Sequence, residues 1–444
     1  MPFFCKERFL RVVALALPAA LGAFIDMAQV LVDFYFVRDL EFAATAAIGI
    51  SVQFMGLFYV FMGVFYIGSN ALMSRFFGGG DINSASMTFS TFAVAALALS
   101  VPAFFVSTAL CEYPFAMMNS GGRVTELGGI YLYIMAFALP PMMINQIAFS
   151  AFSASANIKT PLAIKIVSNI INVILSYALI FGAEAIGIPA YGVAGAAAAT
   201  VFAFYVETAC YVYFLFVKKR PVALIWAIDR SLFWRGIKIG VPGGAERLFT
   251  YGAFLVFMRI IAEFGDSAMT GYQVGLRVES LAFTAGIGFT IAAMSLTGRA
   301  LGAKNPAEAE KDALFTAFLA AVVMGAAGVL IAVFSRPLAE IFRGDDPEAI
   351  KTATEYLICV GLSQIPLGVS FVLSGAFRGA GDTKTSFYIN FTAMCLLRIV
   401  PSIVLAKIFN DVWFVWLAML VETWLCSFWL YLVFRRGKWK LVKV

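Results

Sequence analysis

Three polar residues near the start of the chain lie within an otherwise apolar stretch. Asp26, Gln29 and Asp33 are spaced i, i+3 and i+7, so a helix presents all three on one face. Two carboxylates about two turns apart in a low dielectric take up a proton or another cation more readily than carboxylates in water. The spacing therefore predicts a cation-coupling site at Asp33 and Asp26, with Gln29 beside them. A structural polar seam against neighbouring helices is the alternative.

Neutral oxygen-bearing side chains follow in the middle of the chain's first half. Asn172 and Ser176 are four residues apart and share a helix face, and Thr200 lies in the next apolar stretch. Amide and hydroxyl groups beside a carboxylate can complete an oxygen cage for Na⁺ at Asp33 and Asn172, or they can orient a protonated acid. Asparagine also joins helices through hydrogen bonds in lipid, which is the alternative explanation.

The second half of the chain also carries ionisable residues inside apolar stretches. The candidates for lining a substrate cavity are Glu246, Arg277 and Glu279. Together with Arg247, their formal charges sum to zero. Facing helices would let the four charges neutralise one another, and a purely architectural quartet is the alternative. Arg398 and Glu422 are expected to pair between the last two helices in a structural role.

Several kinds of chemistry lack matching residues. The chain contains no histidine, which excludes histidine-based catalysis, and no G-x-x-x-x-G-K-[ST] loop for ATP hydrolysis. The six cysteines are scattered without metal spacing and indicate neither a disulfide framework nor zinc. The sequence therefore predicts a protein that is not an enzyme, with no catalytic residues, no cofactor and no nucleic-acid partner.

The elements that must position these residues lie in a lipid bilayer. Hydrophobic residues make up 62% and charged residues 13% of the 444 residues, whereas an ordinary soluble domain carries about 25% charged residues. Apolar runs of about twenty residues are long enough to cross the hydrocarbon core as helices. The sequence predicts an all-α integral membrane protein with twelve transmembrane helices, at residues 10–37, 45–74, 86–110, 125–151, 162–184, 191–216, 235–264, 268–298, 309–333, 350–376, 385–406 and 411–434.

Basic residues indicate how the chain is oriented. Lys and Arg gather before residue 12, between residues 218 and 238, and after residue 434, and the alternate loops hold few. Because cytoplasmic loops carry the excess of Lys and Arg, this asymmetry predicts a multi-pass plasma (cell inner) membrane protein with both termini cytoplasmic. The first apolar stretch contains Asp26 and Asp33, so an uncleaved helix is favoured over a signal peptide.

The two halves of the chain repeat one another. Identical residues recur at an offset of 224 residues and, after one inserted residue, at 225: Pro18 and Pro242, Arg75 and Arg299, Gly78 and Gly302, Pro141 and Pro366, Lys159 and Lys384. Six spans per half is an even number, so we expect two six-helix bundles related by a pseudo-two-fold axis along the membrane normal. The predicted domains are an N-terminal bundle at 1–217, a cytoplasmic linker at 218–234 and a C-terminal bundle with a basic tail at 235–444.

Over nearly its full length the chain resembles the multidrug and toxic compound extrusion (MATE) transporters. The residues that carry this resemblance are Val32-Asp33 followed sixteen residues later by Gly49, the loop Gly302 to Asn305 after Arg299, and the loop Phe377 to Thr385 with its first-half echo Phe152 to Pro161. Two further segments look most like the DinF-like branch: Glu246-Arg247 after Gly240-Val241-Pro242, and Arg277-Val278-Glu279-Ser280.

The resemblance implies a secondary active antiporter that exports organic cations or amphipathic drugs in exchange for H⁺ or Na⁺ by alternating access. It places the family's first-helix acid at Asp33, its fifth-helix Asn at Asn172 and a nearby hydroxyl at Thr200. This chain has Ser176 where some members have a second acid, a departure for which Asp26 would compensate. The expected partners are small amphipathic or cationic substrates and the lipid bilayer, and the chain is expected to be a monomer.

Two other functions remain open at this point. A flippase for lipid-linked saccharides, from the wider superfamily, would need a lateral opening and a strongly cationic cavity, whereas the predicted cavity contains charges of both signs. A membrane receptor or scaffold without transport would leave the buried acids inert. A dye-efflux assay with and without an ionophore distinguishes such a scaffold from a transporter.

Overall fold

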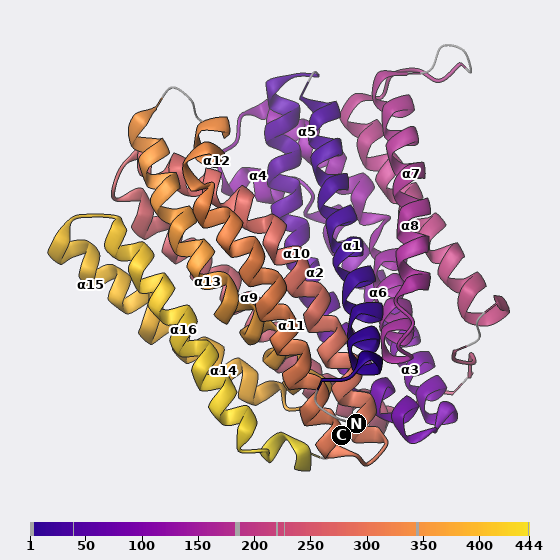
Figure 1. Cartoon of the computed structure of the whole chain (residues 1–444). Coiled ribbons are helices and arrows are strands. Elements are labelled where there is room, and N and C mark those ends of the chain that lie inside the picture. The colour runs from indigo at the N-terminus through magenta and orange to yellow at the C-terminus, as the bar shows by residue number, and fades with distance from the viewer. Residues whose placement is uncertain are drawn as a thin grey trace. The chain divides into compact units, whose positions relative to one another are not determined.

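The computed structural model describes residues 4–38, 40–182, 187–218, 221–225, 227–342, 346–442 and 444. Four basic or aromatic residues of the predicted linker and tail lie outside the described residues: Lys219, Arg220, Trp226 and Lys443. Positions 183 and 184 of the span predicted at 162–184 also lie outside them. The elements of the described chain are helices, as the composition predicts (Figure 1).

The helices of the first half follow the apolar runs. They are α1 (Lys6–Val37), α2 (Phe42–Gly79), α3 (Ile82–Ala109), the short α4 (Tyr113–Met117), α5 (Gly122–Ala136), α6 (Leu139–Ala154), α7 (Lys159–Phe181) and α8 (Gly192–Tyr213) with a π-helical end, η2 (Phe214–Lys218).

The second half repeats this order. Its helices are α9 (Arg230–Ala262), α10 (Asp266–Gly302), α11 (Pro306–Val333), α12 (Ser335–Phe342), α13 (Pro347–Gly379), α14 (Thr383–Ala393), the π-helical turn η3 (Met394–Ile399), α15 (Val400–Phe409), α16 (Trp413–Arg435) and the 3₁₀ turn η4 (Lys438–Leu441).

Ten helical stretches in the described chain are long and apolar enough to cross a membrane, and a pair of helices adds an eleventh. The pair is α5 and α6, which are bent by 51° where they meet and correspond to the predicted span at 125–151. The span predicted at 235–264 coincides with α9, which is 33 residues long but carries Glu246, Arg247 and Arg259 and is not among the ten. The structure therefore supports ten or eleven spans on length and composition.

The same backbone devices recur at the repeat offset. Asp81 caps the start of α3 by accepting a hydrogen bond of 2.9 Å from the Ser84 amide, and Asn305 caps α11 by accepting one of 3.0 Å from the Glu308 amide. The residue before each cap has a positive φ, 77° at Gly80 and 56° at Lys304. Asp81 and Asn305 are related by the offset of 224, so the duplication extends to how the helices begin.

The described contacts divide the chain into two compact units that do not begin at the same places as the sequence halves. One unit is Gly22–Ile237, and the other combines the chain up to Leu21 with Lys238–Val444. The division falls inside α1, whose first part packs in the same unit as α10: a Cβ on Gly288 would lie 2.4 Å from the Ala16 carbonyl oxygen.

The first turns of α9 behave in the corresponding way. They belong to the unit Gly22–Ile237, where a Cβ on Gly68 of α2 would lie 2.3 Å from the Gly236 carbonyl oxygen. Only glycine permits two helix backbones to approach so closely. The first helix of each half therefore starts in one unit and ends in the other.

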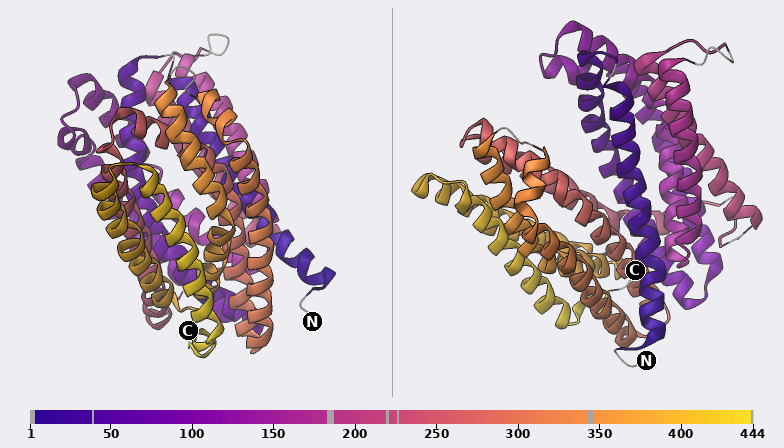
Figure 2. Two further views of the ribbon diagram at one scale, coloured as in Figure 1. Left: turned by 60° about the vertical axis from the view of Figure 1, so that its left-hand side comes forward. Right: turned by 45° about the horizontal axis from the view of Figure 1, so that its top comes forward.

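Each unit has its own packing. In the unit Gly22–Ile237, α6 packs against α2, α3 and α8, and α7 packs against α8. In the other unit, α13 packs against α10, α11 and α16, and α16 also packs against α14 and α15, which follow one another through η3 (Figure 2). The core of this second unit contains stacked Tyr272 and Trp416, whose ring centroids are 5.6 Å apart.

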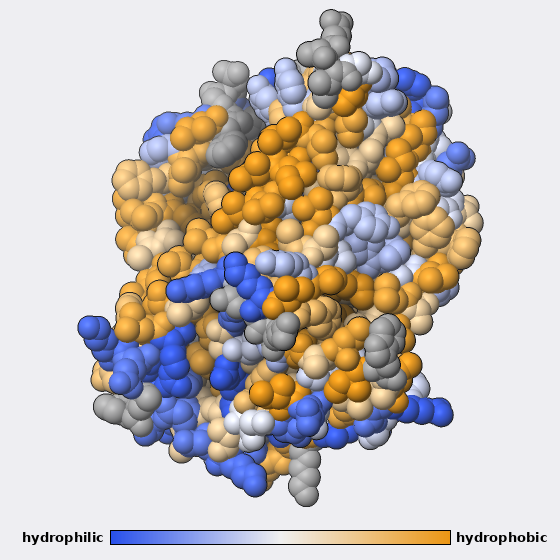
Figure 3. Space-filling model, turned by 90° about the vertical axis from the view of Figure 1, so that its right-hand side faces the viewer, coloured by the Kyte–Doolittle hydropathy of each residue, from blue (hydrophilic) through white to orange (hydrophobic). Residues whose placement is uncertain are grey.

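Apolar side chains cover much of the surface that Figure 3 shows, and hydrophilic side chains gather in its lower part and along its upper edge. Many large hydrophobic side chains are exposed on the spans, including Leu31, Ile174 and Val333, which are 60%, 62% and 68% exposed. Exposed apolar side chains on helices of this length are the expected outer surface of a protein whose solvent is lipid.

Candidate functional site

Asp33 lies near the end of α1 and faces α7. The Ser176 hydroxyl on α7 is the polar group that faces its carboxylate. Asp33 Oδ1 is buried and has no hydrogen-bond partner within the described residues, where no basic side chain pairs with Asp33 either. This carboxylate therefore lies among neutral groups.

The surrounding neutral groups come from α7 and α8. Asn172, one turn before Ser176, donates a hydrogen bond of 3.3 Å to Thr200 Oγ1, which in turn donates one of 3.0 Å to the Ala196 carbonyl. The start of α8 is rich in glycine and alanine, and a Cβ on Gly195 would lie 2.4 Å from the Leu179 carbonyl oxygen. Small residues thus bring Thr200 within reach of Asn172.

Two more polar atoms, on the face of α7 that carries Ser176, lack a hydrogen-bond partner among the described residues. Asn172 Oδ1 and Ser176 Oγ are both buried and unpartnered, and neither residue is exposed at all. A buried polar atom without a partner costs about 1–3 kcal/mol, so a group of such atoms calls for an explanation, such as a bound ion or water. One carboxylate with neutral oxygens around it is a donor set that suits a proton or a hard cation such as Na⁺.

Asp26 is placed differently from Asp33. It lies seven residues earlier on α1, about 10 Å along the helix, and forms a salt bridge with the ammonium group of Lys165 on α7. Gln29 lies between the two acids and is half-buried. The face that the sequence predicts for Asp26, Gln29 and Asp33 thus contains one acid with neutral neighbours and one acid with a basic partner.

Lys165 and Glu207 complete a second charged cluster in this unit, which the prediction did not include. Glu207 on α8 lies close enough to Lys165 and Asp26 for their charges to interact, and it accepts a hydrogen bond from the Asn145 amide. Thr208 donates a hydrogen bond of 2.7 Å to Asn145 Oδ1, which orients that amide. The signal that would have identified Lys165 is its position within an apolar helix, where a charge costs about 2.5–3.5 kcal/mol.

The expected charge quartet of the second half does not form. Glu246 on α9 pairs with Arg378 of α13 at 2.9 Å and accepts hydrogen bonds from Asn390 at 2.7 Å and Ser386 at 3.3 Å. Glu279 instead accepts a hydrogen bond of 2.6 Å from the Tyr356 hydroxyl.

The positions of Arg277 and Glu279 on α10 give the physical reason. Residues two apart on a helix point about 200° apart, so both cannot face α9. Arg277 is exposed and forms no ion pair that we find in the described chain. Glu246 pairs with Arg378, and Glu279, the other acid predicted for the substrate cavity, lies close enough to Arg398 for their charges to interact.

The predicted pairing of Arg398 with Glu422 is confirmed. The Arg398 guanidinium donates two hydrogen bonds to Glu422 Oε2, at 3.0 and 2.6 Å, and lies 5.9 Å from the Phe257 ring centroid. A guanidinium group that donates twice to one carboxylate and also stacks on an aromatic ring is held in one orientation. This geometry is consistent with a structural role.

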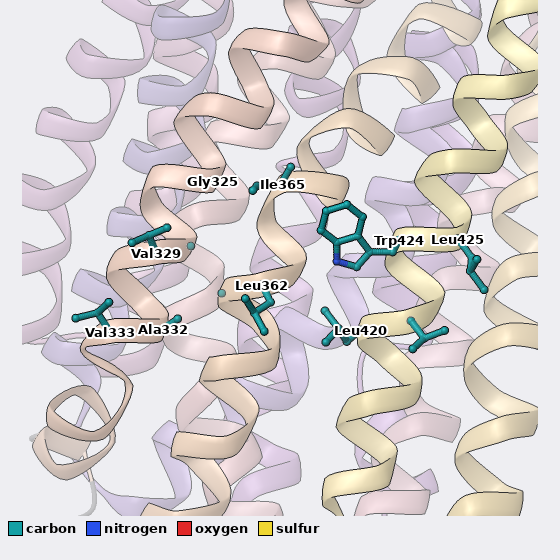
Figure 4. Close-up of a pocket in the computed structure, with 12 residues that line it drawn as sticks. Gly325, Val329, Ala332, Val333, Leu362, Ile365, Leu420, Trp424 and Leu425 are labelled. Carbon is teal, nitrogen blue, oxygen red and sulfur yellow. The ribbon is translucent and has the colours of Figure 1, made fainter.

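The same unit contains an apolar pocket away from these charges. It has a volume of about 530 Å³ between α11, α13 and α16, and Val329, Leu362, Leu420 and Trp424 are among its lining residues (Figure 4). Gly328 and Gly361 approach each other closely at its floor. No charged side chain is among the described residues that line it, so it contributes nothing to ion binding.

Comparison with known proteins shows the same family over most of the chain. The family model described as MatE matches residues 18–178 and 242–404. A probable multidrug resistance protein NorM from Thermotoga maritima is 25% identical over 439 residues, which cover 96% of this chain and 92% of that protein.

Solved structures share the fold at lower sequence identity. The Vibrio cholerae MATE transporter VcmN in its bent form superimposes with a TM-score of 0.90 at 19% identity, covering 97% of each chain. A MOP superfamily transporter from Pyrococcus furiosus, for which a binding pocket of reversed polarity suggests a different function, superimposes with a TM-score of 0.89 at 18% identity, covering 98% of this chain and 96% of that one. Both likenesses concern the fold alone.

Proposed function

Because this chain belongs to the multidrug and toxic compound extrusion family of membrane transporters, we propose that it is a secondary active antiporter. In this proposal it exports organic cations or amphipathic drugs in exchange for H⁺ or Na⁺ by alternating access. Its homologues include multidrug efflux transporters. The members of this family are ion-coupled transporters, so this chain is a transporter and not an enzyme.

One observation carries the assignment of the coupling site. Three buried oxygens have no hydrogen-bond partner in the described chain: Asp33 Oδ1, Ser176 Oγ and, one helix turn from Ser176, Asn172 Oδ1. A proton on Asp33 or a Na⁺ ion among these oxygens would satisfy them. We assign Asp33 as the ion-binding carboxylate, with Asn172 and Ser176 as its oxygen partners and Thr200 orienting Asn172.

Coupling then follows from differential affinity. An ion bound at Asp33 and a bound substrate must favour opposite-facing states, since a ligand shifts an equilibrium only by its difference in affinity for the two states. One charge that crosses 100 mV supplies about 2.3 kcal/mol, which is enough to drive a useful substrate gradient. A pH gradient and a sodium gradient imposed separately on proteoliposomes distinguish H⁺ from Na⁺ as the coupling ion.

The finer topology is part of the same proposal. We propose that α9 is a twelfth span, whose charges are tolerated because Glu246 is paired with Arg378. The chain would then form two six-helix bundles, with the linker 218–234 and both termini on the cytoplasmic side of the plasma (cell inner) membrane. We also propose that the chain is a monomer and that it belongs to the DinF-like branch. The segments around Glu246 and Arg277 support the assignment to that branch.

Two alternatives differ in what they require. A flippase for lipid-linked saccharides needs a strongly cationic cavity, whereas the polar cluster of the unit Gly22–Ile237 contains Asp26, Asp33 and Glu207 against a single Lys165. A receptor or scaffold has no need of unpartnered oxygens around a carboxylate. Both alternatives are therefore disfavoured relative to an ion-coupled exporter.

The test is coupled efflux from proteoliposomes, with a pH gradient and a sodium gradient imposed separately. We expect one of the two gradients to drive efflux of a cationic dye, and we expect Asp33→Asn to abolish this efflux without loss of folded protein. Asp266→Asn is the matched control, because Asp266 is an exposed acid at the start of α10. Coupled efflux that persists in Asp33→Asn would refute the assignment.

A further inference from the structure

The cluster of Asp26, Lys165 and Glu207 is not used by the ion site at Asp33. It lies about two helix turns away along α1, and its members come from three helices of one unit: α1, α7 and α8. Two carboxylates and one ammonium leave one unit of negative charge. A cluster in a membrane protein that keeps a net charge becomes neutral by taking up a further cation or a proton.

The cluster is accessible from outside the unit. The side chain of Asp26 is 52% exposed and that of Lys165 is 23% exposed, whereas Glu207 is only 9% exposed. The ammonium of Lys165 thus lies between an accessible acid and a buried one. An ion pair with this much exposure is weak enough to be exchanged for another cation.

Aromatic side chains border the cluster. Tyr59 on α2, which is 44% exposed, lies within electrostatic range of Asp26 and Glu207. Tyr211 on α8 is also within range of both acids; it is 1% exposed, and its hydroxyl has no hydrogen-bond partner in the described chain. An accessible aromatic ring close to carboxylates, such as that of Tyr59, favours organic cations over small hydrated ions.

The internal repeat has no counterpart of the ion pair between Lys165 and Asp26. The residue that corresponds to Lys165 at the offset of 225 is Asn390, which donates a hydrogen bond of 2.7 Å to Glu246. Glu246 corresponds to Gly22 at the offset of 224, and the Lys165 chain passes 3.7 Å from a Cβ built on Gly22 before it reaches Asp26. The counterpart of Asp26 at this offset is Thr250, so the second half has a neutral residue at each of the two positions that form the ion pair in the first half.

We propose that Lys165 is a tethered cation that the cationic group of the substrate displaces from Asp26 and Glu207. Asp26 and Glu207 then bind an organic ammonium or phosphonium group, and Lys165 determines how strongly such a group must compete. The cluster is a substrate site distinct from the ion site at Asp33. This inference rests on the proposed function, since it names the substrate group that the transporter recognises.

The test measures equilibrium binding of tetraphenylphosphonium to the full-length protein in detergent, with no ion gradient. Lys165→Gln keeps a hydrogen-bond donor and removes the competing charge, so we expect binding about tenfold tighter. Lys165→Arg keeps the charge and pairs more firmly with Asp26, so we expect weaker binding. Glu207→Gln removes one of the two attracting charges and should also weaken binding about tenfold.

The control variant is Lys159→Gln, which removes an exposed lysine at the start of the same helix and should leave the affinity for tetraphenylphosphonium unchanged. An affinity of Lys165→Gln within twofold of the wild type, or a shift of the Gln and Arg variants in the same direction, would overturn the proposal. If Lys165→Gln does not fold, unchanged binding in both Lys165→Arg and Glu207→Gln overturns it instead.

The binding measurement also separates this inference from the proposed function. Coupled efflux with unaltered tetraphenylphosphonium affinity in the Lys165 variants would refute the tethered cation alone. The expected affinity shifts without efflux under either gradient would refute the antiporter and leave the cation site in place.

Discussion

Arg8 and Asp312 form a buried ion pair although 304 residues separate them in the chain. Arg8 Nε donates a hydrogen bond of 2.7 Å to Asp312 Oδ1, and Arg8 Nη2 donates one of 2.8 Å to Glu308 Oε1. The Arg8 side chain is not exposed at all, and that of Asp312 is 2% exposed. The pair joins the first turn of α1 to α11 within one unit, which fixes where the helix that carries Asp33 begins.

Removing Arg8 is expected to destabilise the protein. Arg8→Met leaves Asp312 buried without its closest partner, which costs about 3 kcal/mol, and Arg11, at 3.6 Å from Asp312, compensates only in part. The midpoint of thermal unfolding in detergent should therefore fall. Glu7→Gln, an exposed change at the neighbouring position, is the control. An unchanged midpoint for Arg8→Met would show that the pair contributes nothing to stability.

Asn172 is expected to matter for coupling, whereas its neighbour Asn169 is not. Asn172→Ala removes a buried, unpartnered oxygen that a bound Na⁺ ion or the protonated Asp33 carboxyl would use, and the loss of such a partner costs about 1–3 kcal/mol, so coupled efflux should fall at least tenfold. Asn169 lies on the same helix but donates to the Lys165 carbonyl at 3.1 Å. Efflux from proteoliposomes checks both variants. Equal losses in Asn169→Ala and Asn172→Ala would contradict the assignment.

The close approach of α2 and α9 is expected to be sensitive to a single methyl group. A Cβ on Gly68 would lie 2.3 Å from the Gly236 carbonyl oxygen, so Gly68→Ala must push the two backbones apart, at a cost of about 2 kcal/mol. Gly56→Ala on the same helix meets no atom within 4 Å and should be neutral or slightly stabilising. Thermal unfolding of the two variants measures the difference, and equal midpoints would be inconsistent with this packing.

The cap at Asp81 predicts a small dependence of stability on pH. Hydrogen bonds from Ser84 lower the pKa of the Asp81 carboxyl below its ordinary value of 3.8. A lowered pKa in the folded state adds stability above the unfolded-state value, and this stability is lost as the pH falls through the folded-state value.

The test compares Asp81→Ala with Asp81→Asn by thermal unfolding. Asp81→Ala should cost about 1 kcal/mol at neutral pH, and Asp81→Asn should retain most of the cap because Asn305 caps α11 in the same way. Any advantage of the wild type over Asp81→Asn should disappear below a pH of 3.8. An advantage that persists unchanged at lower pH would show that the carboxylate charge is not its source.

The sequence was sufficient to predict the helices, the duplication and the membrane as solvent, because each depends on local pattern. Runs of apolar residues set where a chain crosses lipid, and the recurrence of Arg75 as Arg299 at a fixed offset needs no contact to be recognised. Asp33, Asn172 and Ser176 could also be identified, since polar residues in an apolar helix are conspicuous. The spacing i, i+4 by itself places Asn172 and Ser176 on one face of a helix.

The tertiary structure decided which charges meet, except for the pair of Arg398 and Glu422, which the sequence already predicted. Nothing in the local pattern pairs Asp26 with Lys165 or Glu246 with Arg378, because each partner lies on a helix more than a hundred residues away. The prediction grouped Glu246 with Arg277 and Glu279 on charge balance, and it omitted Lys165 altogether. Periodicity determines which face of a helix is polar, whereas the packing of helices distant in the chain determines what that face contacts.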